Sequence, residues 1–350
     1  MKRIILISLL FLSAIFSSGQ DKKATSDSVR LWTDGPLTWQ DFCVAGESSS
    51  LPSYAFFKWH PQQHIVKKGH TTYKYTEMTA AIDKASYIKD WSLATDSLRY
   101  KWQTAFDIQQ AYARRYTNTL MTGRYDKKQL MDELHTECID VLNKFESDSS
   151  VEFPPIEDVV DPESVAFKQG SYVFWIGAYA AVPVGPTTKL ASFLDGLCVS
   201  GGYRYKRFTA DATISMTLFP SSSNIRGYYT NYGWQQYYEI TYLSAIADFG
   251  YQFINGERFK MNAFAGAGYG QYQIGQLAGD KYSGPMLNEG IGGEFLLHSF
   301  IDLNGGDIPR NNLSLWFRIY SEQMFLLQKK ATLPSIGFSF GIKLDGASLL

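Results

Sequence analysis

From about residue 170 to the end, apolar residues alternate with small or polar ones, most clearly near the C-terminus. Between residues 336 and 344 one face carries Ile336, Phe338, Phe340, Ile342 and Leu344, and the other Gly337, Ser339, Gly341 and Lys343. Successive side chains of a strand point to opposite faces. A bulky apolar face opposite a small or polar face is typical of a transmembrane barrel, which has lipid outside and a polar lumen inside.

The same alternation predicts eight strands near residues 171–184, 195–206, 207–219, 236–254, 258–274, 285–298, 312–325 and 334–345. Tight turns, one of them at Asn255-Gly256, alternate with longer loops, as is usual in such barrels. The connection over 299–311 is long for the end of the barrel that is expected to carry the tight turns. We therefore expect an all-β transmembrane antiparallel barrel of about eight strands over residues 170–350.

The polar faces of these strands carry charges that are expected to lie in the lumen. They are three acids and three bases: Arg204, Asp211, Asp248, Glu294, Arg318 and Lys343. Side chains fill the interior of an eight-stranded barrel, and an unpaired buried charge costs several kcal/mol. The pattern favours a packed network of mutually neutralising charges over a lumen that passes or binds something.

Residues 20–147 are predicted to form a small α+β domain. Helical periodicity covers residues 96–120, and a second helix is expected to begin at Asp126, a good N-cap residue. The segment 148–169 is rich in acidic residues and contains Pro154, Pro155 and Pro162, which prevent regular structure. We expect this segment to be an extended tether between the domain and the barrel.

The first 19 residues have the pattern of a secretory signal peptide. A basic start at Lys2 and Arg3 precedes an apolar run over 4–16 and small residues at 17–19. Export followed by barrel strands predicts the outer membrane of a Gram-negative-type cell. The barrel would then contact outer-membrane lipid, with the N-terminal domain in the periplasm.

Composition narrows the classes of partner. The net charge of -1 gives no field that would attract nucleic acid. Aromatic residues make up 15%, which suits the aromatic girdles of membrane barrels. Of the three cysteines, Cys198 falls in a barrel strand, so only Cys43 and Cys138 could pair, and their spacing does not require it.

Trp32 and the segment 37–42, Leu-Thr-Trp-Gln-Asp-Phe, resemble the opening of a family of exported, zinc-metalloprotease-like domains. In that family the next helix carries an HExxH motif followed by Phe-Asp, then a glutamate and an Ala-Arg pair. The helix over 101–114 follows this frame at Phe106-Asp107 and at Ala113-Arg114. The resemblance covers roughly residues 30–120 and implies a metalloprotease-like fold.

The residues that would carry the chemistry are absent. Two histidines at i and i+4 would bind zinc, and the glutamate would act as general base. The chain has Lys101, Trp102 and Ala105 at these positions, and Gln110 at the later glutamate. Alanine cannot bind a metal, a lysine ammonium has no free lone pair, and tryptophan cannot take a proton from water. We expect a degenerate motif with no metal, no cofactor and no catalytic residue.

Four alternatives have weaker support, and one of them is an atypical hydrolase in the periplasmic domain. His60 and His64 are four residues apart, but in a strand this spacing is ~13 Å, too far for one ion. A lipid-modifying barrel enzyme could use His298, although Glu294 on the same strand is again ~13 Å away. A soluble lipocalin-like barrel would place its apolar face inside. The sequence favours a non-enzymatic outer-membrane protein whose domain binds or scaffolds a periplasmic protein or another cell-envelope partner.

Overall fold

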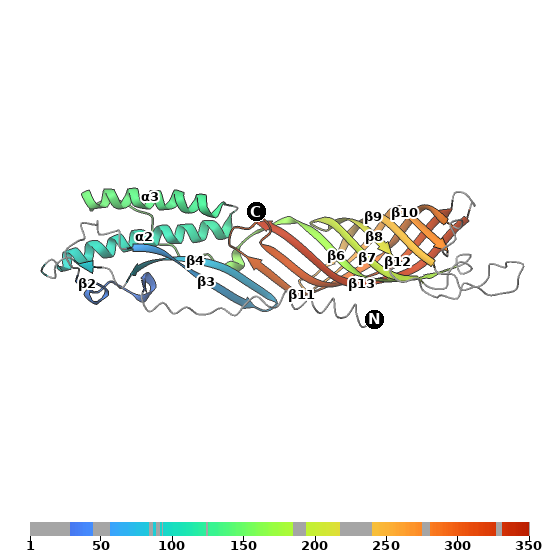
Figure 1. The fold of residues 1–350 in the computed structure, drawn as a ribbon, viewed down its shortest axis with the longest axis horizontal. Coiled ribbons are helices and arrows are strands. Elements are labelled where there is room, and N and C mark those ends of the chain that lie inside the picture. Colours follow the sequence, from blue (N-terminus) through green and yellow to red (C-terminus); the bar gives the residue numbers. More distant parts are fainter. Residues whose placement is uncertain are drawn as a thin grey trace, which may run out of the picture.

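Eight antiparallel strands close into a barrel in the C-terminal half of the computed structural model (Figure 1). The structure describes residues 29–44, 57–83, 87–88, 92, 94–123, 125–184, 194–217, 240–274, 281–326 and 331–349. The expected signal peptide and the tips of the longer loops lie outside these residues. The strands are β6 (Phe167–Pro183), β7 (Leu194–Tyr205), β8 (Phe208–Met216), β9 (Ile240–Asn255), β10 (Phe259–Ile274), β11 (Lys281–Asp302), β12 (Arg310–Leu326) and β13 (Ala331–Leu349).

Each barrel strand pairs with its neighbours along the chain, and β13 pairs with β6 to close the circle. Two of the short connections are those expected, at Lys206-Arg207 and after Asn255. Lys206 has a φ of 55°, the left-handed conformation that a tight turn needs. The closed topology confirms the predicted eight-stranded antiparallel barrel.

The barrel has its apolar face outside, as the alternation predicts. Phe338, Phe340 and Ile342 are exposed, whereas Ser339 between them is buried. Exposed large apolar residues surround the whole barrel and include Phe174, Ile176, Ile214, Leu243, Phe249, Leu287, Ile291, Phe295, Leu315, Ile319 and Ile336. This arrangement is the reverse of a lipocalin-like barrel, in which the apolar face would be inside.

The N-terminal domain consists of a sheet, a helix packed on it and a second helix packed on the first (Figure 1). The sheet contains β1 (Val29–Leu31), β3 (Phe57–Lys68) and β4 (Thr71–Asp83), and the helices are α2 (Asp96–Thr122) and α3 (Lys127–Ser147). Short elements complete it: η1 (Trp32–Asp34), η2 (Trp39–Asp41), and the pair β2 (Cys43–Val44) and β5 (Tyr87–Ile88). None of the helices in the described part of the chain is long and apolar enough to span a membrane.

Both predicted helices are present, and the first turn of α3 is capped as the sequence suggests. The Asp126 side chain accepts hydrogen bonds from the backbone N–H groups of Lys128 and Gln129. Thr95 caps α2 by accepting from the N–H of Leu98. These caps satisfy donors that have no partner within the helix. One core joins both helices to the sheet, around Phe106, Tyr116, Leu134, Cys138 and Leu142.

The N-terminal sheet is continuous with the barrel wall. Residues 71–74 of β4 pair in parallel with residues 299–302 of β11. The N–H of Ser299 donates to the carbonyl of His70 and that of Leu303 donates to the carbonyl of Lys74, both at 2.8 Å. The predicted end of this strand at 298 was therefore wrong, because pairing with β4 extends β11 to Asp302. The long connection expected over 299–311 shortens to 303–309.

The segment predicted as a tether ends earlier than expected, because β6 begins at Phe167 rather than near residue 171. Residues 148–166 lack long regular elements, as expected, but they are packed rather than a free tether. Asn118 on α2 donates to the carbonyl of Asp158 at 2.9 Å and accepts from the N–H of Val160 at 3.0 Å. A turn at η5 (Pro162–Ser164) follows. Val165 then enters a cluster with Leu349, which is fully buried. The expected end of the last strand near residue 345 is also corrected, because β13 continues to Leu349 against this cluster.

Candidate functional site

The positions of the degenerate metal motif lie on α2 and make structural contacts. Lys101 Nζ is 2.5 Å from a carboxylate oxygen of Glu146 at the end of α3. The Trp102 ring is buried, and its centroid lies 4.8 Å from that of Phe42. Ala105 is buried in the same core. These three side chains hold the helices and the N-terminal segment together.

Gln110, where the family's later glutamate would stand, satisfies the open edge of β4. Its Oε1 accepts a hydrogen bond from the N–H of Ala80 at 2.8 Å, and the side chain is completely buried. Thr117, two turns further along α2, accepts from the N–H of Met78 at 2.8 Å. Because β1 and β11 pair with the two ends of this edge and leave its middle open, side chains of α2 supply the missing acceptors.

The segment that resembles the metalloprotease-like family packs against α2. Trp32 Nε1 donates to Asp107 at 2.8 Å, and the N–H of Leu37 donates to Oε1 of Gln103 at 2.7 Å. The described residues of the domain contain no group of three or more His, Cys, Asp or Glu placed to hold a metal ion. His64 instead lies 3.0 Å from Glu77.

Two cysteines are buried free thiols, Cys138 on α3 and Cys198 on β7. Burial raises the pKa of Cys138 to about 12, so it remains protonated and unreactive at neutral pH. The side chain of Cys43 lies outside the described residues. Cys138 is therefore a core residue of the helical pair and has no disulfide partner.

The structure brings the six predicted lumen charges together in two groups. Arg318 lies 2.9 Å from both Asp211 and Asp248, one carboxylate for each terminal nitrogen. In the second group Glu294 is 2.8 Å from Arg204 and 2.5 Å from Lys343. No strand supplies both partners of a pair, so the network ties together strands from opposite sides of the barrel.

Sequence reasoning missed two members of the second group. Asp345 Oδ2 accepts from Arg204 at 2.7 Å, and Lys260 Nζ lies 3.3 Å from Glu294. Both alternate correctly with their apolar neighbours, so the same pattern could have identified them. Asp345 lies two residues beyond Lys343 on the inner face, at the predicted end of the last strand.

The half of the lumen farther from the N-terminal domain is filled by aromatic and apolar side chains, which the sequence analysis did not anticipate. The ring centroids of Trp175 and Trp316 are 3.9 Å apart. The Arg318 guanidinium lies 4.8 Å from the Trp175 ring and 4.5 Å from that of Phe264. Large residues such as Tyr179, Tyr242, Tyr272, Met286 and Met324 continue the packing. Two cavities lined by described lumen residues, one in each half, measure only ≈ 20 Å³ each, which agrees with a lumen that side chains fill.

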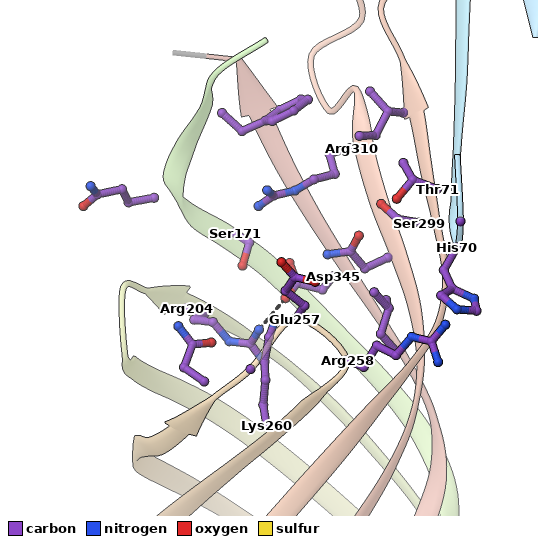
Figure 2. A pocket seen from close by; sticks show the side chains of 18 of the residues that line it. His70, Thr71, Ser171, Arg204, Glu257, Arg258, Lys260, Ser299, Arg310 and Asp345 are labelled. Carbon is purple, nitrogen blue, oxygen red and sulfur yellow. Dashed lines mark hydrogen bonds and ion pairs between the residues drawn. The ribbon is translucent and has the colours of Figure 1, made fainter. Parts of the chain in front are cut away.

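A much larger cavity, of ≈ 1130 Å³, lies where the barrel meets the N-terminal domain (Figure 2). We call it the junction cavity. Its wall combines the β3–β4 turn, the short barrel turns and the inner ends of several strands. The charged residues that line it are Lys68, Glu163, Arg204, Lys206, Arg207, Glu257, Arg258, Lys260, Arg310 and Asp345, with His70 beside them. Seven bases against three acids make the cavity strongly positive.

Some of these charges are already paired. Lys68 forms ion pairs with Asp161 and Glu163, and the hydrogen bond that its ammonium donates to Glu163 raises the pKa of Lys68 above the ordinary value. Arg204 and Lys260 belong to the Glu294 group described above. The remaining bases form no ion pair with another described residue; they are Lys206, Arg207, Arg258 and Arg310. The surplus positive charge is therefore concentrated on the barrel turns and the start of β12.

Polar atoms without partners lie on the same wall. Arg310 Nε and Asp345 Oδ1 are buried and have no hydrogen-bond partner. Figure 2 shows Asp345 between Arg310 and Arg204 on one side of the cavity, with Arg258 opposite them near His70. Nearly all buried polar groups in folded proteins are hydrogen-bonded, so these two atoms mark a place that a polar ligand would complete.

His298 does not form the acid–base pair that a lipid-modifying site would need. Its Nε2 lies 2.9 Å from Oγ1 of Thr72 on β4, and its ring packs on Phe300. Glu294 is committed to Arg204, Lys260 and Lys343 inside the lumen. The histidine thus contributes to the joint between barrel and domain.

No protein-family model matches the chain, and no curated protein is significantly similar to it. Solved structures do match its barrel. Neisserial surface protein A is 14% identical, and the match covers 49% of this chain and 95% of that protein, with a TM-score of 0.32. Ail of Yersinia pestis, solved with a heparin analogue, is also 14% identical. The match covers 50% of this chain and 99% of Ail, with a TM-score of 0.30. OprG from Pseudomonas aeruginosa is 9% identical. The match covers 53% of this chain and 99% of OprG, with a TM-score of 0.28. The likeness concerns the fold of the barrel alone, and the resemblance of the N-terminal domain to metalloproteases stays a prediction.

Proposed function

We propose that this protein is a non-enzymatic outer-membrane barrel that presents its N-terminal domain in the periplasm as a fixed binding or scaffolding module. The observation that carries the proposal is the pairing of β4 with β11, which makes the domain a continuation of the barrel wall. A domain joined in this way keeps one orientation relative to the membrane, as a scaffold requires.

The barrel exterior supports the membrane location. Exposed Phe, Ile, Leu and Tyr side chains surround it, and an apolar surface of this extent is unusual for a soluble monomer. The N-terminal domain lies at the end of the barrel that carries the turns Lys206-Arg207 and 256–258. Short turns face the periplasm in outer-membrane barrels, and this supports a periplasmic position for the domain.

The absence of enzymatic activity is proposed from what the motif residues do. Lys101, Trp102 and Gln110 are committed to an ion pair, a hydrophobic core and a backbone hydrogen bond. Restoring a metal-binding residue at any of them would remove one of these contacts. The domain therefore offers a folded surface and a cavity rather than a catalytic centre.

Two measurements test the location. Cell fractionation should find the protein in the outer membrane, and its gel mobility should change on boiling, as for a folded barrel. A cysteine introduced at Lys128, exposed on α3, should react with a membrane-impermeant reagent only after the outer membrane is opened. The matched control is a cysteine at Lys281, at the far end of the barrel, which should react on intact cells. Recovery of the protein without detergent in a soluble fraction would contradict the proposal.

A further inference from the structure

The junction cavity has the features of a binding site for an anion. Its charged wall has seven lysines or arginines against three carboxylates, and four of those bases form no ion pair with another described residue. Two of these four lie over aromatic rings, Arg310 over Phe167 and Lys206 over Tyr205. Its volume of ≈ 1130 Å³ is slightly above the usual range of ligand pockets, about 300–1,000 Å³. The cavity is thus large enough for a small molecule and carries the charge to hold an anionic one.

The kind of anion follows from the donors. Three of the four bases without an ion pair are arginines: Arg207, Arg258 and Arg310. A guanidinium presents several donors in a planar fork, which fits the oxygens of a phosphate in a bidentate manner. We propose that the junction cavity binds a phosphate ester, with Arg258 and Arg310 as its main contacts.

A phosphate ester also accounts for the acid on the same wall. Asp345 uses one oxygen to accept from Arg204, while its buried Oδ1 has no partner. A hydroxyl group next to the phosphate would donate to this oxygen, whereas a bare anion would only be repelled by it. A glycerol phosphate group supplies both features, either as a soluble molecule or as the headgroup of phosphatidylglycerol.

The position of the cavity makes both sources accessible. Exposed aromatic residues surround the barrel at this end, among them Tyr172, Tyr203, Tyr205, Phe208 and Tyr251. Aromatic side chains of this kind sit at the level of lipid headgroups. The lipid source rests on the proposed function, because it requires the barrel to be in a membrane, but the soluble source does not.

The test is a calorimetric titration of the full chain, purified in detergent, with three probes. Glycerophosphate represents the soluble source, short-chain phosphatidylglycerol represents the headgroup, and succinate is a dicarboxylate control at equal ionic strength. The double variant Arg258→Gln/Arg310→Gln should weaken binding roughly tenfold or more, since two charge-assisted hydrogen bonds are lost. Lys128→Gln, which removes an exposed charge from α3, should leave binding unchanged.

Every result of this titration either supports or overturns the proposal. Tighter binding of glycerophosphate than of succinate supports a soluble ligand, and binding of phosphatidylglycerol alone supports the headgroup. Failure of both phosphate probes, equal binding of succinate, or an unaffected double variant overturns the proposal. The gel mobility shift on boiling shows whether the variant barrel folds; if it does not, Arg207→Gln/Arg258→Gln changes only turn residues. Because fractionation tests the membrane location separately, the cavity proposal can fail while the proposed function stands.

Discussion

At the scale of single side chains, the outer face of β13 gives the most direct test of membrane insertion. Phe340 is exposed near the middle of this strand, between Phe338 and Ile342. Phe340→Arg should destabilise the folded barrel in lipid vesicles by about 2–4 kcal/mol, because the charge would lie in the hydrocarbon region. Phe340→Leu is the matched control and should have little effect. Equal stability of the two variants in urea titrations would show that this face does not contact lipid.

The lumen network offers a second residue-level prediction. Arg318 contacts both Asp211 and Asp248, so Arg318→Met leaves two buried carboxylates without their cation. Removing one partner of a buried pair costs about 3–5 kcal/mol. Asp248→Ala should cost less, since Arg318 keeps Asp211. The triple variant Arg318→Met/Asp211→Asn/Asp248→Asn removes all three charges and should recover much of the loss, and no recovery would mean that packing around Arg318 dominates.

A third prediction concerns Gln110. Gln110→Leu removes the acceptor of the Ala80 N–H, and an unsatisfied buried donor costs about 1–3 kcal/mol. Denaturation of the full chain, followed by the helical circular dichroism signal, should show this loss for the N-terminal domain. Gln129→Leu, on the exposed side of α3, is the control. If both variants were equally stable, the side chain would not be needed to complete the β4 edge.

At the scale of elements, the register between β4 and β11 can be tested by cross-linking. Thr71 and Ser299 are direct partners in this parallel pair, so cysteines at both positions should form a disulfide. A protease site inserted at Ser149-Ser150, an exposed turn, would divide the chain between them. The two fragments should stay together on a non-reducing gel. Cysteines at Thr71 and Ile301, two residues out of register, should cross-link much less, and equal yields would indicate a mobile joint.

Patterns within a few residues of the sequence were enough to predict the helices and strands that interactions between nearby residues determine. Asp126 at the start of α3 and the alternation around Phe340 are visible within a few residues, and both helices and all eight strands were found from such signals. The β4–β11 pairing was not predicted, because nothing near Thr71 or Ser299 indicates a partner more than two hundred residues away. The ends of β11 and β13 were misplaced for the same reason.

At the scale of the whole molecule, the site was only partly predictable. The alternation placed six charges in the lumen and was sufficient to place Asp345 there too. It could not show that Asp345 pairs with Arg204, or that Trp175 and Trp316, on the two strands that flank β13, are in contact. The junction cavity could not be predicted from the sequence, since it forms only where the domain packs against the barrel. Its arginines come from β7, from two separate turns and from the start of β12, and no motif connects them.

The closed lumen gives a prediction for the complete barrel. Two cavities lined by described lumen residues measure only ≈ 20 Å³ each, the two ion-pair groups cross the lumen, and the Trp175 and Trp316 rings are buried in it. An eight-stranded barrel has an interior that side chains can fill, so ions have no continuous path. Planar-bilayer recordings of the purified protein should show no steady, large single-channel conductance, in contrast to a general porin measured in the same bilayers. The Asp248→Ala variant should also remain closed, because the tryptophans and the second ion-pair group are untouched. Steady conductance from the unmodified barrel would mean that the lumen is open, and a transport role would then have to replace scaffolding.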